Sequence, residues 1–259
     1  MTADERLVAA VREQLGLGRL VALGDPEDGA WLAERAAARV LRRAVAEAVG
    51  DVRVAGLRLA LADPTTAAAP VVPPPPSGLP SGPLRIAAEC AVGMTRPFPE
   101  HAAAVRAALV RAATERVGLT VSAVDVHVVA LLDETEPAEP VPGAAPAAVR
   151  PTRDRSADPV AEAVLAVPGV LGLSDALPGA SRPRVLGGPG GDPEPGGAPA
   201  PSRRLVRMQL VLDAGRRTLD VVRDARAAAA EAAAATSPDP VVVSLLVTDL
   251  TDEPPPTGP

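Results

Sequence analysis

Few side chains in this sequence are spaced for acid–base chemistry, and the best pair is Asp125 and His127. Two residues apart on a strand, they point to the same face and are neighbours. Such a pair could act as a general base oriented by a carboxylate. No good nucleophile stands beside it, so we interpret it as structural. His101, at the start of an expected helix, is interpreted as a solvated or capping residue.

The remaining reactive residue types do not form a recognisable site. Two histidines and one cysteine at scattered positions lack the spacing of metal ligands. Cys90 stands in an expected strand and is predicted to be a small buried hydrophobe. Gly16 and Gly18 lack the third glycine, preceding strand and downstream acid of a dinucleotide-binding loop. We therefore expect no catalytic residue, no metal and no cofactor.

The composition excludes several function classes. Every one of the 26 basic residues is arginine, so a P-loop lysine and a Schiff-base lysine are absent. Trp31 and Phe98 are the only aromatic residues, which leaves no platform for stacking single-stranded bases. The net charge of −6 also argues against a general nucleic-acid binder.

Four arginines gather on one face of a helix expected over residues 30–49, opposite its alanine, valine and leucine residues. One interpretation is a docking face for an acidic partner or anionic head groups. The simpler one, which we favour, is an ordinary solvated helix face. The four residues are Arg35, Arg39, Arg42 and Arg43.

The sequence also predicts a cytoplasmic location. A single cysteine allows no intrachain disulfide, which fits a reducing compartment. The first residues are acidic where a signal peptide would be basic. No apolar run approaches the roughly 18–20 residues of a membrane span.

Hydrophobic periodicity predicts helices and strands in alternation. Helices are expected over residues 4–15, 30–49, 99–117, 159–167 and 218–235, with Gly118 as a helix C-cap. Strands are expected over residues 57–62, 84–92, 120–132, 184–186, 204–213 and 241–249.

This order of elements repeats along the chain. The pentapeptide Val45–Val49 recurs as Val160–Val164, and the central and last strands recur at a similar spacing of about 120 residues. We therefore predict an α+β fold of two similar helix–strand–strand–helix–strand modules. The first module spans residues 1–133, and the second spans 158–252.

The 31 prolines gather in stretches that we expect to lie outside the packed modules. Residues 134–157 form the predicted linker, and 253–259 a disordered tail. Residues 64–83 and 178–202 are predicted to be long disordered hairpin loops, since lengthening a loop costs little free energy. Each should therefore join two paired strands.

Two segments resemble the alkaline-shock (envelope stress response) protein family. Val167–Leu173, after a helix, is similar to its "VPGV" opening, and Gly118–Val128 to its closing strand. Each module retains half of this signature: Gly50-Asp51-Val52 replaces the opening in the first, and Ser237–Val241 the close in the second. Residues 14–31 are also similar to actinobacterial proteins labelled "nucleopolyhedrovirus" family.

The resemblance implies a non-catalytic, cytoplasmic protein that self-associates, in some members at the inner membrane surface through an anchored partner. We expect a scaffold whose strand edges or helix faces bind a protein partner or a second copy. A regulatory protein of unknown ligand is not distinguished from it by sequence. The alternative is an enzyme or small-molecule binder with a cleft between the modules.

Overall fold

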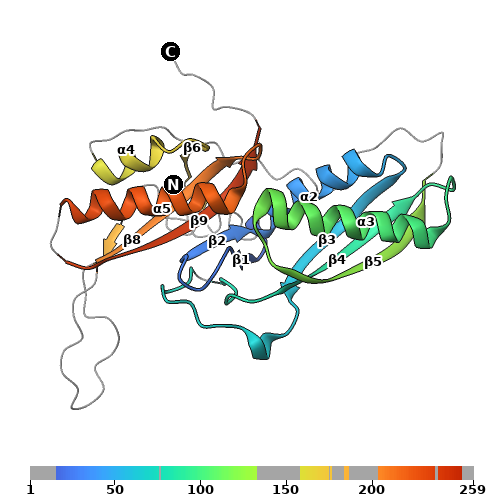
Figure 1. The fold of residues 1–259 in the computed structure, drawn as a ribbon, viewed down its shortest axis with the longest axis horizontal. Helices are drawn as coiled ribbons and strands as arrows, with labels where there is room; N and C mark the ends of the chain where they lie inside the picture. The colour runs from blue at the N-terminus through green and yellow to red at the C-terminus, as the bar shows by residue number, and fades with distance from the viewer. Residues whose placement is uncertain are drawn as a thin grey trace, which may run out of the picture.

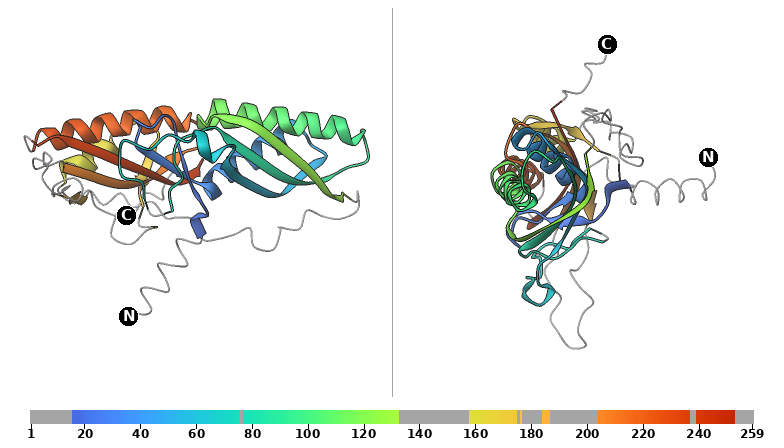
Figure 2. Two further views of the ribbon diagram at one scale, coloured as in Figure 1. Left: turned by 90° about the horizontal axis from the view of Figure 1, so that it is seen from below. Right: turned by 90° about the vertical axis from the view of Figure 1, so that its right-hand side faces the viewer.

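A computed structural model describes residues 16–75, 77–132, 158–174, 176, 184–186, 204–236 and 239–252. The chain is α+β, with helices packed on two sheets that lie side by side along the long axis of the molecule (Figure 1). Seen from below, helices α5 (Thr218–Ala234) and α3 (Phe98–Ala112) lie nearly end to end along one side (Figure 2).

The three-stranded sheet has the order β3-β4-β5, comprising β3 (Val52–Leu61), β4 (Leu84–Val92) and β5 (Val121–Leu131). The first pair is antiparallel and the second parallel. Helices α2 (Glu34–Ala48) and α3 (Phe98–Ala112) pack on this sheet. A π-helical turn, η2 (Ala113–Val117), extends α3 to Gly118, whose φ of 91° confirms the predicted C-cap glycine.

The six-stranded sheet draws on both ends of the chain. Its order is β1-β2-β9-β8-β6, and β7 also pairs with β8. Helices α4 (Pro159–Leu165) and α5 (Thr218–Ala234) belong to this half. The strands are β1 (Leu20–Ala22), β2 (Ala30–Ala33), β6 (Val170–Leu173), β7 (Arg184–Leu186), β8 (Arg204–Asp213) and β9 (Val241–Thr251).

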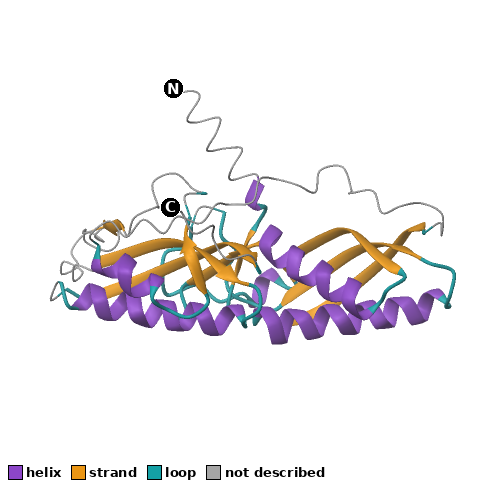
Figure 3. Cartoon of the chain, turned by 90° about the horizontal axis from the view of Figure 1, so that it is seen from above, coloured by secondary structure: helices purple, strands orange, loops and turns teal. Residues whose placement is uncertain are grey.

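Both halves pair their strands in the same way. The run α2-β3-β4-α3-β5 has an antiparallel pair followed by a parallel one, and the run from α4 to β9 has the same pattern. Each parallel pair also contains a register shift, after Cys90↔Val128 in one and after Leu210↔Val247 in the other. Figure 3 shows the helices along one side of both sheets.

The predicted helix over residues 30–49 is wrong at its start, because Ala30–Ala33 is strand β2 and α2 begins at Glu34. All four residues of β2 are buried, and the strand pairs in parallel with β9. The Glu34 carboxylate accepts from the backbone N–H of Leu59 at 2.7 Å, which fixes the first turn of α2. Thus β1 and β2, within the range 1–133, complete the sheet of the other half.

The expectation that residues 64–83 form a disordered loop is also wrong. The segment contains the short 3₁₀ helix η1 (Pro64–Thr66) and docks on the β1–β2 hairpin. Leu79 N–H donates to Leu20 O at 2.8 Å, and Trp31 Nε1 donates to Leu79 O at 3.1 Å. Val72 is buried. These hydrogen bonds and the burial of Val72 therefore order the segment, although its proline-rich composition suggested disorder.

Both predicted strand pairings around the proline-rich stretches are confirmed. Leu57 pairs with Ala88 between β3 and β4, and Val185 pairs with Val206 between β7 and β8, each in antiparallel fashion. Most of residues 178–202 lies outside the described residues. So do the predicted helix over 4–15, the linker 134–157 and the tail 253–259.

The core is built from aliphatic side chains, as the composition predicts. Alanine, valine and leucine make up most of it, and Trp31 is its only buried aromatic residue among those described, because Phe98 is exposed. None of the described helices is long and apolar enough to cross a membrane.

Candidate functional site

The four arginines of α2, interpreted from the sequence as a solvated face or alternatively as a docking face, do not form one solvated stripe. Arg39 lies 2.9 Å from Asp249 Oδ1 of β9, and the Asp249 side chain is only 2 % exposed. Arg43 pairs with Glu47 at 2.8 Å and with Asp252 just past β9. Arg35 and Arg42 are half-buried, and burial lowers the pKa of each guanidinium. Two of the four therefore bind α2 to the other half of the molecule.

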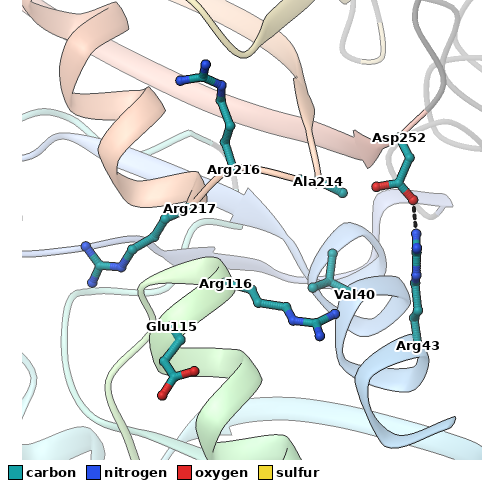
Figure 4. A pocket seen from close by; sticks show the side chains of 9 residues that line it. Val40, Arg43, Glu115, Arg116, Ala214, Arg216, Arg217 and Asp252 are labelled. Atoms are coloured by element: carbon teal, nitrogen blue, oxygen red, sulfur yellow. Dashed lines mark hydrogen bonds and ion pairs between the residues drawn. The ribbon is translucent and has the colours of Figure 1, made fainter. Parts of the chain in front are cut away.

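A pocket of about 240 Å³ lies where the two halves meet (Figure 4). Its wall is formed by α2, the η2 turn, the loop before α5 and the residue that follows β9. The lining residues are Val40, Arg43, Glu115, Arg116, Ala214, Gly215, Arg216, Arg217 and Asp252. This volume is below the roughly 300–1,000 Å³ of most small-molecule sites.

The charged groups of this pocket are largely paired with one another or with near neighbours. Arg116 lies 2.8 Å from Glu47, and Arg217 lies 2.6 Å from Asp220. Arg217 Nε also donates to Thr114 O at 3.3 Å, from one half to the other. The Arg216 side chain extends away from Arg116 and Glu115 (Figure 4). The hydrogen bonds and ion pairs around the pocket thus stabilise the junction between the two halves. An anionic ligand would have to compete with these ion pairs.

A second polar cluster, which the sequence did not reveal, closes one end of the three-stranded sheet. Asp51 accepts from Thr95 Oγ1, lies 2.7 Å from Arg96 NH2 and lies 2.8 Å from His101 Nε2. These bonds, the Thr95 bond most of all, hold the pKa of the Asp51 carboxyl well below its usual range. His101 is fully buried, and α3 has no side-chain cap hydrogen bond, which corrects the interpretation of His101 as a solvated or capping residue.

The geometry of the Asp51 cluster is that of a structural clamp. Thr95 and His101 both bond the Asp51 carboxylate, so the imidazole is not placed against the hydroxyl as a base that could activate it. Asp51 and His101 are 50 residues apart, and no local spacing signals their contact. The one available signal was that His101 lies in the first turn of a helix that follows β4.

Asp125 and His127 do lie on one strand, β5, as predicted. Asp125 Oδ2 lies 3.0 Å from Arg85 NH1 on β4, and the His127 side chain is exposed to solvent. Cys90 is buried, as predicted, and burial raises the pKa of its thiol. Within the described ranges, no three His, Cys, Asp or Glu side chains are grouped to hold a metal ion.

The most conspicuous exposed surface is the outer edge of β5, the last strand of its sheet. Val128, Val129 and Leu131 are 41 %, 56 % and 53 % exposed. Across the described part of the chain, the other exposed large hydrophobics except Val71 come from α3 and the loop before it: Met94, Phe98 and Val110.

The corresponding strand of the other half has no such exposure. Aligned on their register shifts, Val128 matches Val247 and Leu131 matches Leu250, which are 0 % and 1 % exposed. Strand β2 lies beside β9 and pairs Leu32 with Val247. The same edge is therefore covered by β2 and β1 in one half, whereas no described residue pairs with it in the other.

The comparisons with known proteins identify no relative: no family model, no curated protein and no solved structure matches this chain.

Proposed function

We propose that this protein is non-catalytic and works by binding another protein chain along the outer edge of β5. The observation that carries the proposal is the concentration of exposed apolar side chains there, set against the covered edge of β9. An uncovered strand edge presents unpaired N–H and C=O groups, which makes it a template for pairing with a further strand.

The design of this edge supports pairing. Natural sheets protect open edges with proline, lysine, inward-pointing charge or short strands. Strand β5 has 11 residues, contains no proline and no arginine, the basic residue that this chain uses in place of lysine, and ends in Val128-Val129-Ala130-Leu131. Such an edge attracts added strands, and apolar side chains around it supply contact area.

The shared pairing pattern of the two halves supports a second part of the proposal, that they are two divergent copies of one module. The resemblance to the alkaline-shock family agrees with a protein that associates, and peripheral attachment to a membrane through a partner belongs to the same proposal.

The competing function, a small-molecule binder or enzyme with a cleft between the modules, has less support. The junction pocket is small, and most of its charged side chains are engaged in ion pairs. The Asp51 cluster places no base against a nucleophile.

The proposal predicts that Val129→Lys abolishes association, because a lysine on the edge opposes an added strand by charge and by lost apolar contact. The matched control is Val71→Lys, an equally exposed valine (61 % against 56 %) on the segment before β4. Both variants should keep the wild-type stability to within about 0.5 kcal/mol, as surface substitutions do.

The measurement is molar mass by light scattering over a range of protein concentrations, together with recovery of partners from cell extract. Association of the wild type and Val71→Lys that is lost in Val129→Lys supports the proposal. If all three remain monomeric and recover no partner, or if Val129→Lys associates like the wild type, the proposal fails.

A further inference from the structure

We propose, resting on the function above, that the chain bound to the β5 edge is a second copy of this protein, antiparallel to the first, with the twofold axis at Val126. The two three-stranded sheets would join into one continuous sheet. The argument uses the direction of the backbone groups, the sequence of β5 and its charges.

The backbone at the centre of β5 presents the groups that this pairing needs. Val124 O accepts from Arg106 Nε at 3.2 Å, so this carbonyl points away from β4, toward the edge. Backbone direction alternates along a strand, so Val126 and Val128, before the register shift, also face the edge. With the twofold axis at Val126, Val126 pairs with Val126 of the second copy, and Val124 pairs with Val128 of the second copy. Arg106 then yields Val124 O to an N–H of the second copy.

The sequence of β5 is self-complementary about Val126. Reversed on itself, it places Val121 against Leu131, Ala123 against Val129 and Val124 against Val128, so that these apolar residues meet apolar residues, and the small residues Ser122 and Ala130 face each other. Exposed valine and leucine side chains on one copy thereby find apolar partners on the other.

The charges specify the same register. Asp125 of each copy stands opposite His127 of the other, at positions without backbone bonds, where side chains approach most closely. Sliding the strands by two residues in one direction places Asp125 opposite itself, and like charges facing each other are unfavourable. Sliding them by two residues in the other direction places His127 opposite itself and removes both Asp125–His127 contacts. Within one copy, Arg85 lies 3.0 Å from Asp125, and Glu89 is the register partner of His127 across the β4–β5 ladder, so polar side chains continue across the joined face.

The helices add contact area beside the strands. Helix α3 packs against β5, and its Val110 and Arg106 are exposed. In an antiparallel pairing about Val126, the α3 helices of the two copies lie on the same face of the joined sheet. The second copy then covers the outer edge of β5, as β2 and β1 cover the edge of β9.

Cysteine cross-linking between two variants tests the register. Asp125→Cys and His127→Cys are purified separately, mixed and oxidised. Facing residues at such positions have Cα atoms about 4.5 Å apart, within disulfide reach. We expect a disulfide-linked dimer of the two variants in the mixture, and no disulfide-linked dimer when either variant is oxidised alone. The mixed dimer keeps one Asp125–His127 pair, between the two unmutated positions.

Arg58→Cys mixed with His127→Cys is the control, because Arg58 is exposed on β3, across the sheet from β5. The buried Cys90 is present in all samples. Cross-linking equal in the mixture, the single variants and the control, or absent from all, overturns the twofold pairing. If Val129→Lys still abolishes association in that case, the β5 edge is used with another partner or register and the proposed function stands. If Val129→Lys has no effect, both proposals fail.

Discussion

Asp51 holds three side chains together at the end of the three-stranded sheet, and one of them is the imidazole of a fully buried histidine. A buried polar group costs little only while it is hydrogen-bonded. His101 Nδ1 has no hydrogen-bond partner among the described residues, so the bond from Nε2 to Asp51 is the one that offsets its burial. The stability of this end of the sheet therefore depends on a single carboxylate.

Asp51→Ala should reduce the free energy of unfolding by about 1–3 kcal/mol, because it leaves the buried Nε2 without a partner. Asp51→Asn keeps a hydrogen-bonding oxygen and should cost less. Urea denaturation at neutral pH measures both. Equal stability of Asp51→Ala and the wild type would show that His101 finds another partner.

The same carboxylate predicts a pH dependence. Its pKa is lowered in the folded protein, so its contribution to stability is fully present above its unfolded pKa of about 3.9. That contribution is lost as the pH falls below about 4 toward the folded pKa. The stability difference between the wild type and Asp51→Asn should therefore shrink between neutral pH and about pH 3.

At the scale of elements, β2 is the strand that connects distant parts of the chain. It pairs with β9, more than 200 residues later, and its Trp31 also holds the segment before β4 through Leu79 O. Four buried apolar residues with no polar residue among them have no periodicity of their own. Their strand conformation depends on pairing with β9, and the sequence around β2 gives no sign of that pairing.

Trp31→Phe tests this connection. The smaller ring leaves a void and removes the donor to Leu79 O, so we expect a loss of about 1–3 kcal/mol in unfolding free energy. The amides of Val71 and Leu79, which bond to Pro26 O and Leu20 O, should exchange hydrogen faster than in the wild type. Unchanged exchange at both amides would mean that the segment is held by other contacts. Phe98→Leu, at an exposed ring, is the control.

Periodicity in the sequence predicted the elements with strong local signals. The helix ending at Gly118, the strand pairs on either side of residues 64–83 and the buried Cys90 are all found. The burial of His101 and the docking of residues 64–83 depend on Asp51 and β1, which lie far away in sequence. The sequence predicts that strand edges or helix faces bind a partner, but which strand edge is uncovered depends on the topology of both sheets.

On the scale of the whole molecule, the two halves are joined through α2, β2 and the η2 turn. Gly118, at the end of that turn, lies so close to α5 that a Cβ there would collide with the Leu219 side chain. Thr218 Oγ1 donates to Arg116 O at 3.5 Å, and Arg217 reaches Thr114 O. These contacts and the β2–β9 pairing make the junction part of the core, so we expect the halves to unfold together.

Arg39→Ala tests that cooperativity at its most buried ion pair. Asp249 is almost fully buried, and once Arg39 is removed it retains the hydrogen bond from the Leu250 N–H and the more distant charge of Arg35. Removing the charged partner of a buried carboxylate destabilises the folded protein, and we expect the free energy of unfolding to fall by about 1–3 kcal/mol. Calorimetry should show one transition at a lower Tm for Arg39→Ala, whereas Arg111→Ala, at an exposed arginine on α3, should match the wild type. Two separate transitions in the wild type would show that the halves fold independently and that the junction is only a contact surface.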